Sequence, residues 1–242
     1  MATKYEWIAA DLRNRIAAGE FAAGRLLPSE SELGGAYAVS RMTVRRALER
    51  LRDEGLVDSR QGFGWFVAAP PLLQTLGRLG TIEAQLEGSG RRSERRVLDF
   101  GFVEAPPHAA SVLGGGRVLE VRRVNTVDGV PWARVTVWCP EVLATNLSLA
   151  DVERATFHEL LDVELAGASQ TIAAAAVTAA DAEVLGVPQG SPALVCERIT
   201  YAADGTPVLL AEHAFPGHLT EFVVELGAVD SSVAPTGLRL VR

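Results

Sequence analysis

The sequence predicts an α+β protein made of two parts, a small helical part that ends in a hairpin and a larger part built on an antiparallel sheet. Residues 1–68 contain three helix-like segments and then two short β-prone runs around a glycine-containing turn. Residues 79–242 contain longer β-prone runs separated by short helical segments, a mixture typical of α+β domains. Residues 69–78 include Pro70 and Pro71 and are predicted to be the linker.

The first two helices are predicted from apolar spacing and from capping residues. Apolar side chains recur at helical spacing from Tyr5 to Ile16, and Gly19 follows them. Ser29 is followed three residues later by Glu32, which is the pattern of a capping box. A short second helix is therefore expected to begin after Ser29.

The third helix and the hairpin complete a winged helix-turn-helix. Ser40 is a suitable N-cap and Gly55 supplies a C-terminal stop. Two β-prone runs follow, with Gly62 in the turn between them, which predicts a hairpin. The apolar positions of the third helix recur at helical spacing and are expected to face the core: Val44, Ala47, Leu48 and Leu51.

The charge of the chain is unevenly distributed between the two parts. The net charge is -7, but residues 1–67 hold 10 Lys+Arg against 9 Asp+Glu, which leaves 13 against 21 in the remainder. Five arginines lie within residues 41–52. A basic patch on a near-neutral domain suits contact with a phosphate backbone, while the acidic second part stays away from it.

The third helix has the composition of a DNA recognition helix. Its outer face carries Arg41, Thr43, Arg45 and Arg46, and arginine donors suit both guanine edges and phosphates. An arginine-rich helix taken alone is more often a solvated amphipathic face. The combination with two preceding helices and a glycine-tipped hairpin favours DNA binding.

The second part is predicted to contain two related hairpins in one sheet. Residues 123–131 and 198–207 each contain an arginine, an Asp-Gly turn and a proline, so each predicts a strand, a turn and a strand. The predicted strands are 97–103, 117–126, 132–139, 193–201 and 207–215, and the predicted helices lie near 81–88, 157–165 and 179–186.

Arg123 is the most informative residue of the second part. In the alternating strand it shares a face with Leu119 and Val121, so it is expected to point inward. A buried arginine needs a carboxylate partner or an anionic ligand. Glu212, on the second hairpin, is the candidate partner, and both interpretations stay open at this point.

Composition excludes several other classes of protein. No apolar run reaches the length of a membrane span, and the N-terminus has no signal-peptide core, so neither is expected. Cys139 and Cys196 lie outside any metal-binding spacing and are expected to be buried thiols in a reducing cytoplasm. No cofactor, metal, catalytic residue or nucleophile–base set is expected, so the protein is not predicted to be an enzyme.

Residues 5–67 resemble the GntR family of winged-helix regulators. The resemblance is carried by Tyr5…Gly19, Gly24…Leu33, Ser40…Gly55 and Gly62…Val67. It departs from the family pattern at Ser31, where an arginine is common, and at Trp65, where a small hydroxyl residue is usual. The resemblance implies that Arg41, Thr43 and Arg45 contact the operator and that Gly62 enters the minor groove. The full set of expected DNA-binding residues is Ser29, Ser40, Arg41, Thr43, Arg45, Arg46, Gln61 and Gly62.

The region from about residue 79 to the C-terminus resembles the UTRA effector domain of the HutC branch. Its motifs include Thr156-Phe-His158-Glu-Leu160-Leu161 and the two Asp-Gly hairpins. The resemblance implies a chorismate lyase-like antiparallel sheet with flanking helices, an effector pocket and a dimer. The expected effector-binding residues are Thr81, Arg123, Asn125, Arg134, Thr156, His158 and Glu212.

Several of these residues have more specific expectations. The resemblance implies an effector contact at Arg123 and an acid near Glu212. Asn125 stands where sugar-phosphate sensors carry a second arginine, and Arg134 is the expected substitute. Thr156 and Thr81 are expected at helix starts, where anions are favoured.

Three hypotheses follow. The first is a cytoplasmic homodimeric repressor that binds a palindromic operator and releases it on binding a small anionic metabolite. This metabolite is expected to be a sugar phosphate, a phosphonate or phosphate-related compound, or a carboxylic acid. The second is an enzyme, since the fold is shared with a lyase. The third is a sensor that has lost its ligand and only dimerises, with Arg123 held by Glu212.

Overall fold

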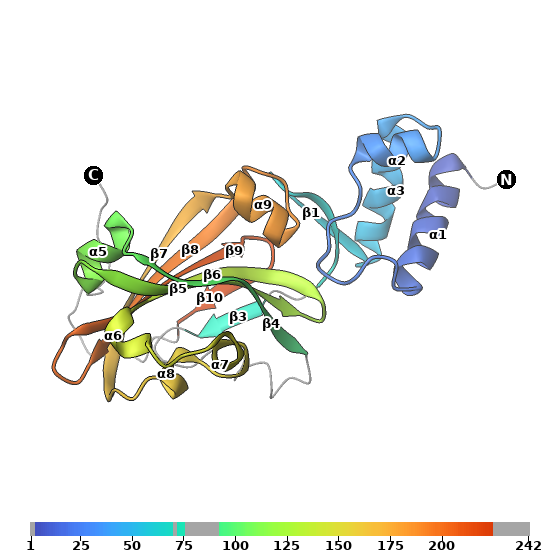
Figure 1. Cartoon of the computed structure of the whole chain (residues 1–242). Coiled ribbons are helices and arrows are strands. Elements are labelled where there is room, and N and C mark those ends of the chain that lie inside the picture. The colour runs from blue at the N-terminus through green and yellow to red at the C-terminus, as the bar shows by residue number, and fades with distance from the viewer. Residues whose placement is uncertain (1–2, 70–71, 76–91, 225–242) are drawn as a thin grey trace, which may run out of the picture.

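The computed structural model describes residues 3–69, 72–75 and 92–224 (Figure 1). Its N-terminal part is three helices and a two-stranded hairpin, as the sequence predicts. These elements are α1 (Lys4–Ala17), α2 (Glu30–Ala36), α3 (Arg41–Asp53), β1 (Val57–Arg60) and β2 (Gly64–Val67).

Capping residues determine where α2 and α3 begin. The Ser29 hydroxyl accepts a hydrogen bond from the backbone N–H of Glu32, and the Glu32 carboxylate accepts one from the N–H of Ser29. Ser40 caps α3 by accepting from the N–H of Thr43. Each cap satisfies N–H groups that have no partner inside the helix, so both predicted starts are confirmed.

The core of the N-terminal part lies where α1, α2 and α3 meet the hairpin. The predicted inward residues of α3 are all fully buried. Gly62 has a φ of +85° in the turn between β1 and β2, a conformation that favours glycine. The fully buried side chains of α1 and α3 are Ile8, Ala9, Leu12, Val44, Ala47, Leu48 and Leu51.

The second part is built on a six-stranded antiparallel sheet with the strand order β4-β5-β6-β9-β8-β7. The five predicted strands are confirmed, and each extends slightly beyond its predicted bounds. The strands are β4 (Ser93–Glu104), β5 (Arg117–Val127), β6 (Val130–Pro140), β7 (Leu165–Ala176), β8 (Pro192–Ala202) and β9 (Pro207–Pro216).

The two predicted hairpins are β5–β6 and β8–β9, and they are neighbours because β6 pairs with β9. Asp128 and Gly129 both have positive φ, 52° and 78°, the pair of angles that a type I′ hairpin turn requires. Gly205 has φ +85° in the second turn. The internal repeat seen in the sequence therefore corresponds to two adjacent hairpins of one sheet.

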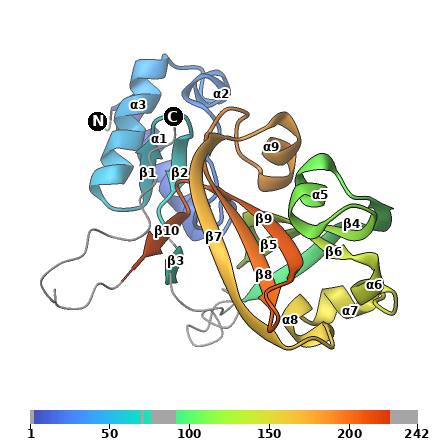
Figure 2. The same cartoon turned by 90° about the vertical axis from the view of Figure 1, so that its left-hand side faces the viewer.

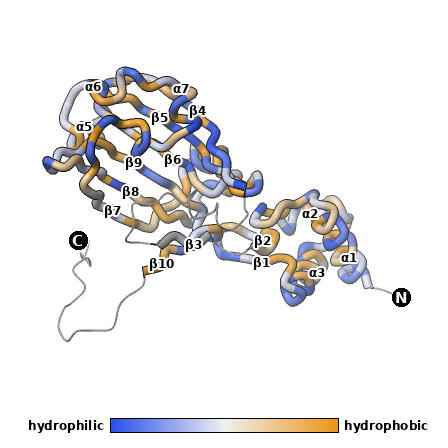
Figure 3. The backbone as a smooth tube through the Cα atoms, turned by 90° about the horizontal axis from the view of Figure 1, so that it is seen from below, coloured by the Kyte–Doolittle hydropathy of each residue, from blue (hydrophilic) through white to orange (hydrophobic). Residues whose placement is uncertain are grey.

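Helices cover both faces of the sheet. Figure 1 shows α9 on one side of it and α6, α7 and α8 on the other. Figure 3 shows hydrophobic residues along the sheet and along the N-terminal helices, in keeping with a core in each part. The helices are α5 (Pro107–Leu113), α6 (Glu141–Ala144), α7 (Leu149–Arg154), α8 (Phe157–Leu160) and α9 (Ala179–Leu185).

The helix predicted near 157–165 is wrong in length. Only residues 157–160 are helical, and a strand that was not predicted, β7, begins at Leu165. Residues 173–176 of that strand are four alanines, the residue with the highest helix propensity. Hydrogen bonding to β8 along the whole strand outweighs this local preference.

Part of the predicted linker is a strand. β3 (Leu72–Thr75), which lies inside the predicted linker, pairs in parallel with β10 (Thr220–Val223) at the end of the described chain. Thr81 and the helix predicted near 81–88 lie outside the described residues. Within the described ranges no helix is long and apolar enough to cross a membrane.

The hairpin β1–β2 packs against the second part, near α9 (Figure 2). Phe63 in its turn is buried in an apolar cluster with Leu185 of α9 and Val187 just after it. The ring of His218 lies 4.4 Å from that of Phe63 and 4.9 Å from that of Phe66. We call β1–β2 and its turn the wing, and this contact ties the wing to the sheet domain.

Candidate functional site

The outer face of α3 is a cationic surface. Arg41, Arg45, Arg46 and Arg50 are all exposed, and Thr43 is partly exposed beside them. The opposite face of the helix is fully buried in the core. The helix therefore presents guanidinium donors to solvent from a rigid support, as a helix that enters a DNA groove must.

Two of these arginines are held by neighbouring side chains. Arg45 forms a bidentate ion pair with Glu30, with both N–O distances at 2.8 Å. The indole N–H of Trp65 donates to the same carboxylate at 3.1 Å. Arg41 donates to the hydroxyl of Ser31 at 3.0 Å. The two positions that depart from the family pattern, Ser31 and Trp65, thus help to orient the two arginines.

The expected hydroxyl contacts have structural roles in this conformation. Ser29 and Ser40 are N-caps, and the hydroxyls of Ser40 and Thr43 are hydrogen-bonded to each other at 2.9 Å. All three lie at the N-terminal ends of α2 and α3. They stand beside the arginines, on the side of the domain that carries the cationic surface.

The tip of the wing contacts the sheet domain. The buried hydroxyl of Ser191 donates to the carbonyl oxygen of Gly62 at 2.9 Å. A Cβ atom on Gly62 would stand 2.8 Å from the Pro192 ring, so only glycine fits here without a shift. Gln61 and Gly62 remain exposed to solvent. Contact with a DNA groove at this tip would compete with contact to Ser191 and Pro192.

The register of the sheet separates the expected effector-binding residues into two groups. Paired residues on neighbouring antiparallel strands share a face, and successive residues of a strand alternate between faces. Arg123 pairs with Val135, which pairs with His213. Glu212 is the residue before His213, so it projects from the other face of the sheet.

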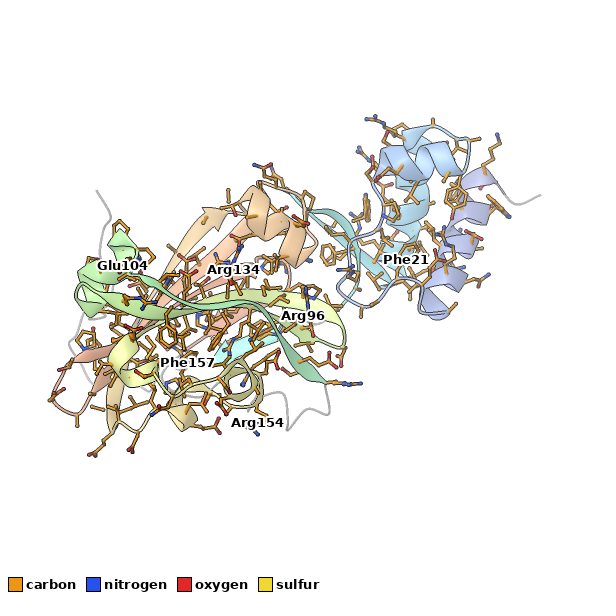
Figure 4. All side chains as sticks on the ribbon, viewed as in Figure 1. Phe21, Arg96, Glu104, Arg134, Arg154 and Phe157 are labelled. Atoms are coloured by element: carbon orange, nitrogen blue, oxygen red, sulfur yellow. The ribbon has the colours of Figure 1, made fainter. Side chains whose placement is uncertain are left out.

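We name the two faces after the helices that cover them. The α8 face carries Arg123, Asn125 and His213 and is covered by α6, α7 and α8; its apolar residues form one core with Phe157 of α8. The α9 face carries Arg134 and Glu212 and is covered by α5 and α9. Figure 4 shows Arg134 and Phe157 on opposite sides of the sheet.

Of the two interpretations left open for Arg123, the pairing with Glu212 is contradicted by the structure. The partner of Glu212 is Arg134, at 2.7 Å, and Arg134 also pairs with Asp181 of α9 at 2.7 Å. Arg134 also cannot substitute for an arginine at Asn125, because the two project from opposite faces. Alternation in a strand sends neighbours to opposite sides, and the sequence alone does not fix which strands pair.

Arg134 is the centre of a closed network on the α9 face. Burial disfavours its charge, but the hydrogen bonds to Asp181 and Glu212 outweigh burial and raise its pKa. Burial raises the pKa of Asp181, yet the hydrogen bond from Arg134 lowers it below its usual value overall. The Thr136 hydroxyl accepts a further hydrogen bond from Arg134 at 3.2 Å. This geometry is that of a structural ion pair.

Four of the expected effector-binding residues lie on the α8 side of the sheet, two on β5 and two at α8. Arg123 and Asn125 are buried, 9% and 3% exposed, as the alternation of the strand predicts. Thr156 is the N-cap of α8, and His158 lies in the same helix. Burial, and then the positive charge of Arg198, lower the pKa of His158.

Arg198 is a residue of this face that the sequence reasoning did not select as a site. Arg198 pairs with Ala211, which pairs with Val137, which in turn pairs with Val121. Such a row of paired residues shares one face, and Val121 is two residues from Arg123, so Arg198 projects from the α8 face. Burial lowers the pKa of its guanidinium. The sequence did contain a signal for Arg198. In the internal repeat, Arg198 occupies in the second hairpin the position that Arg123 occupies in the first.

The remaining polar groups were compared with the requirements of a metal site and of a reactive thiol. Among the described residues no group of three or more His, Cys, Asp and Glu side chains is arranged to hold a metal ion. Cys139 and Cys196 are free and buried, and burial raises the pKa of each thiol to about 12.

Comparison with known proteins assigns a family to each part of the chain. Residues 4–67 match the bacterial regulatory proteins of the gntR family, and residues 88–220 match the UTRA domain. The HTH-type transcriptional repressor NagR of Bacillus subtilis is 29% identical over 225 residues, which cover 90% of this chain and 93% of NagR. An HTH-type transcriptional regulator of Mycobacterium tuberculosis is 33% identical over 208 residues, covering 83% of this chain and 77% of that protein.

A further relative and a solved structure agree with this assignment. The histidine utilization repressor of Pseudomonas aeruginosa is 28% identical over 194 residues, which cover 78% of each protein. The crystal structure of PhnF from Mycobacterium smegmatis superimposes with a TM-score of 0.61 at 27% identity, over 91% of this chain and 99% of PhnF.

Proposed function

The chain belongs to the gntR family of bacterial regulatory proteins, in the HutC-type branch that carries a UTRA domain, and we propose that it is a transcriptional repressor controlled by a small anionic metabolite. The metabolite binds on the α8 face of the sheet domain and lowers the affinity of the winged helix for its operator. The observation that carries the DNA-binding half is the cationic outer face of α3, supported by a fully buried inner face.

Their position, orientation and chemistry support Arg41, Arg45 and Thr43 as operator contacts. They lie on one side of α3, and two of them are arginines already oriented by Ser31 and Glu30. Arginine reads guanine by paired hydrogen bonds and also binds phosphate. Exchange of the ion pair with Glu30 for a contact with a base or phosphate costs little, because the side chain of Arg45 is half exposed in it.

Basic side chains on the α8 face support an anionic effector. Arg123 and Arg198 both project from this face, and His158 stands close enough to Arg198 for its pKa to respond. The two rows of sheet residues that contain these arginines carry no carboxylate within the described strands. A carboxylate or phosphate group would give the terminal nitrogens of Arg198 an anionic partner.

α9 provides a mechanical connection between the sheet and the wing. Its Asp181 holds Arg134 of the sheet, and its Leu185 packs with Phe63 of the wing. A ligand that changes the sheet under α9 would therefore change the position of the wing. The effector needs only to favour one arrangement over another, so the proposal includes no catalytic step.

We further propose that the protein acts as a homodimer on a palindromic operator. Two winged helices related by a two-fold axis bind two half-sites, and affinity depends on both fitting at once. A change in the position of each wing then has a large effect on operator affinity.

The proposal is tested by measuring binding to DNA fragments from the chromosomal neighbourhood of the gene, at two salt concentrations. Selective binding that weakens with salt is expected. Arg41→Ala should weaken specific binding by about 1–3 kcal/mol, or roughly 5- to 150-fold. Arg154→Ala, at an exposed arginine of α7, is the matched control and should leave affinity unchanged. Equal losses in both variants, or uniform weak binding to every fragment, would contradict the proposal.

A further inference from the structure

Arg198 has hydrogen-bonding capacity that its surroundings do not use. Its Nε donates to the side-chain oxygen of Gln170 at 2.8 Å. Its two terminal nitrogens form no hydrogen bond or ion pair with any residue that the structure describes, although the side chain is partly buried. Gln170 is neutral, so the charge of Arg198 is not balanced by a direct partner.

His158, in the helix α8 that covers this face, has an unused nitrogen of its own and lies within electrostatic range of Arg198. Its Nε2 is buried and has no hydrogen-bond partner among the described residues. Burial and the neighbouring guanidinium of Arg198 lower the pKa of His158, and the Glu159 carboxylate opposes them with a smaller effect. A buried polar atom without a partner is costly in a native protein, and an anion here would give both groups a partner.

Arg134 shows what an arginine with a purely structural role looks like in this same sheet. It is buried, and it donates to the carboxylates of Asp181 and Glu212. No carboxylate lies in the row of Arg198 from β4 to β7, whose other members include Val121, Ala211 and Gln170. The structural explanation that accounts for Arg134 is therefore missing for Arg198.

Arg123 and Arg198 are too far apart on the sheet to be one point of attachment. Arg123 is on β5 and Arg198 on β8, with β6 and β9 between them. Three strand spacings, together with an offset of two residues along the strands, place their backbones roughly 16 Å apart. Both side chains project from the α8 face, so they approach the same space from two sides.

We propose that Arg198 and His158 form a second anion-binding subsite, so that the effector carries two anionic groups, carboxylate or phosphate, one toward Arg198 and one toward Arg123. This inference rests on the proposed function and makes it more specific. A compound with a single anionic group fills only one of the two subsites. A linear molecule with an anionic group at each end matches the separation of the two arginines.

The test compares linear dicarboxylates of increasing chain length with monocarboxylates of equal length, and with inorganic phosphate, at constant ionic strength. Thermal unfolding of the full chain and calorimetric titration give the stabilisation and the Kd. The variants are Arg198→Gln and Arg123→Gln. Arg154→Gln, on the exposed side of α7, controls for general loss of positive charge.

The expected result is that dicarboxylates of one length range stabilise the protein more than the matched monocarboxylates. Arg198→Gln and Arg123→Gln should each weaken that binding by about tenfold or more, as for loss of a hydrogen bond between charged groups, and Arg154→Gln should not. His158→Gln should weaken it less than Arg198→Gln.

Two results would overturn the inference and separate it from the proposed function. If every anion that binds loses affinity in Arg123→Gln but not in Arg198→Gln, the effector site stands and the second subsite does not. If none of the probes stabilises the protein, the second subsite is rejected. The operator-binding experiment with Arg41→Ala then decides independently whether the protein is a regulator.

Discussion

The two faces of the sheet use the same side chain for opposite purposes. On the α9 face Arg134 is held between Asp181 and Glu212, each at 2.7 Å. On the α8 face Arg198 has one neutral partner, Gln170. The row of the α9 face that contains Arg122 also carries three carboxylates, those of Asp99, Glu212 and Glu197.

This difference shows that burial alone does not tell a structural arginine from a binding one. Burial opposes the charge of both Arg134 and Arg198, but only Arg134 has carboxylates that reverse the effect, so its pKa rises while that of Arg198 falls. A buried ion pair with good geometry holds a fold in one arrangement. A partly buried cation without a direct counter-ion, such as Arg198, is a candidate site for an anion.

Removal of Arg134 should have the largest effect on stability. Arg134→Met leaves the buried carboxylate of Asp181 without its partner, so we expect a loss of about 3–5 kcal/mol in the free energy of unfolding. Arg198→Met removes a charge that has no carboxylate partner and should cost far less. Urea unfolding of the two variants measures both. Equal losses would mean that the carboxylate partners of Arg134 do not make it more important for stability than Arg198.

The next largest effect is a loss of folding stability at acidic pH, caused by His218, which packs against the wing. His218 contacts Phe63 and Phe66, its Nε2 lies 3.3 Å from the Gly24 carbonyl oxygen, and Arg60 is the nearby charge. Burial lowers the pKa of His218 to about 4. The folded state therefore favours the neutral ring.

Its contribution to stability, about 3 kcal/mol, is fully present above pH 6.5 and is lost as the pH falls toward 4. The carboxylate of Asp181 also stabilises the folded protein less as the pH falls, but at lower pH. Because its pKa is lowered in the folded state, its contribution to stability is lost only below about pH 3.8. Urea unfolding between pH 4 and 7.5 separates the two. His218→Asn should flatten the curve above pH 4, and an unchanged curve would show that His218 does not titrate there.

A smaller effect is expected where the wing meets the sheet domain. Ser191→Ala removes the hydrogen bond to the Gly62 carbonyl, at a cost of about 1 kcal/mol. Opening of the wing should become roughly fivefold more frequent, which faster amide hydrogen exchange at Phe63 would report. Ser111→Ala, at an exposed serine of α5, is the control. No change in exchange would mean that Ser191 does not hold the wing.

The smallest effect is a change in one titration on the α8 face. Arg198→Gln removes a positive charge beside His158, so the pKa of His158 should rise. Arg134→Gln, on the other face, should leave it unchanged. A titration followed by NMR of the imidazole resonances measures both variants. A rise in both would show that the two faces are not electrostatically separate.

Local sequence patterns determined most of the fold and the DNA-binding surface. Helical spacing, the Ser29 and Ser40 caps and the glycine turn of the wing act over a few residues, so they can be identified without knowledge of the rest of the chain. The same is true of the two Asp-Gly hairpins. The local pattern of β7 was misleading, because pairing with a distant strand outweighs the helix propensity of its alanines.

The sequence by itself therefore determined the two-part architecture, the cationic face of α3 and the inward direction of Arg123. Only the tertiary structure decided that Arg134 pairs with Glu212 and that Arg198 joins Arg123 on the other face. Alternation tells which residues of one strand share a side, but strand order and register decide which side chains of different strands meet. These depend on the packing of the whole sheet between its two layers of helices, which no short segment of sequence encodes.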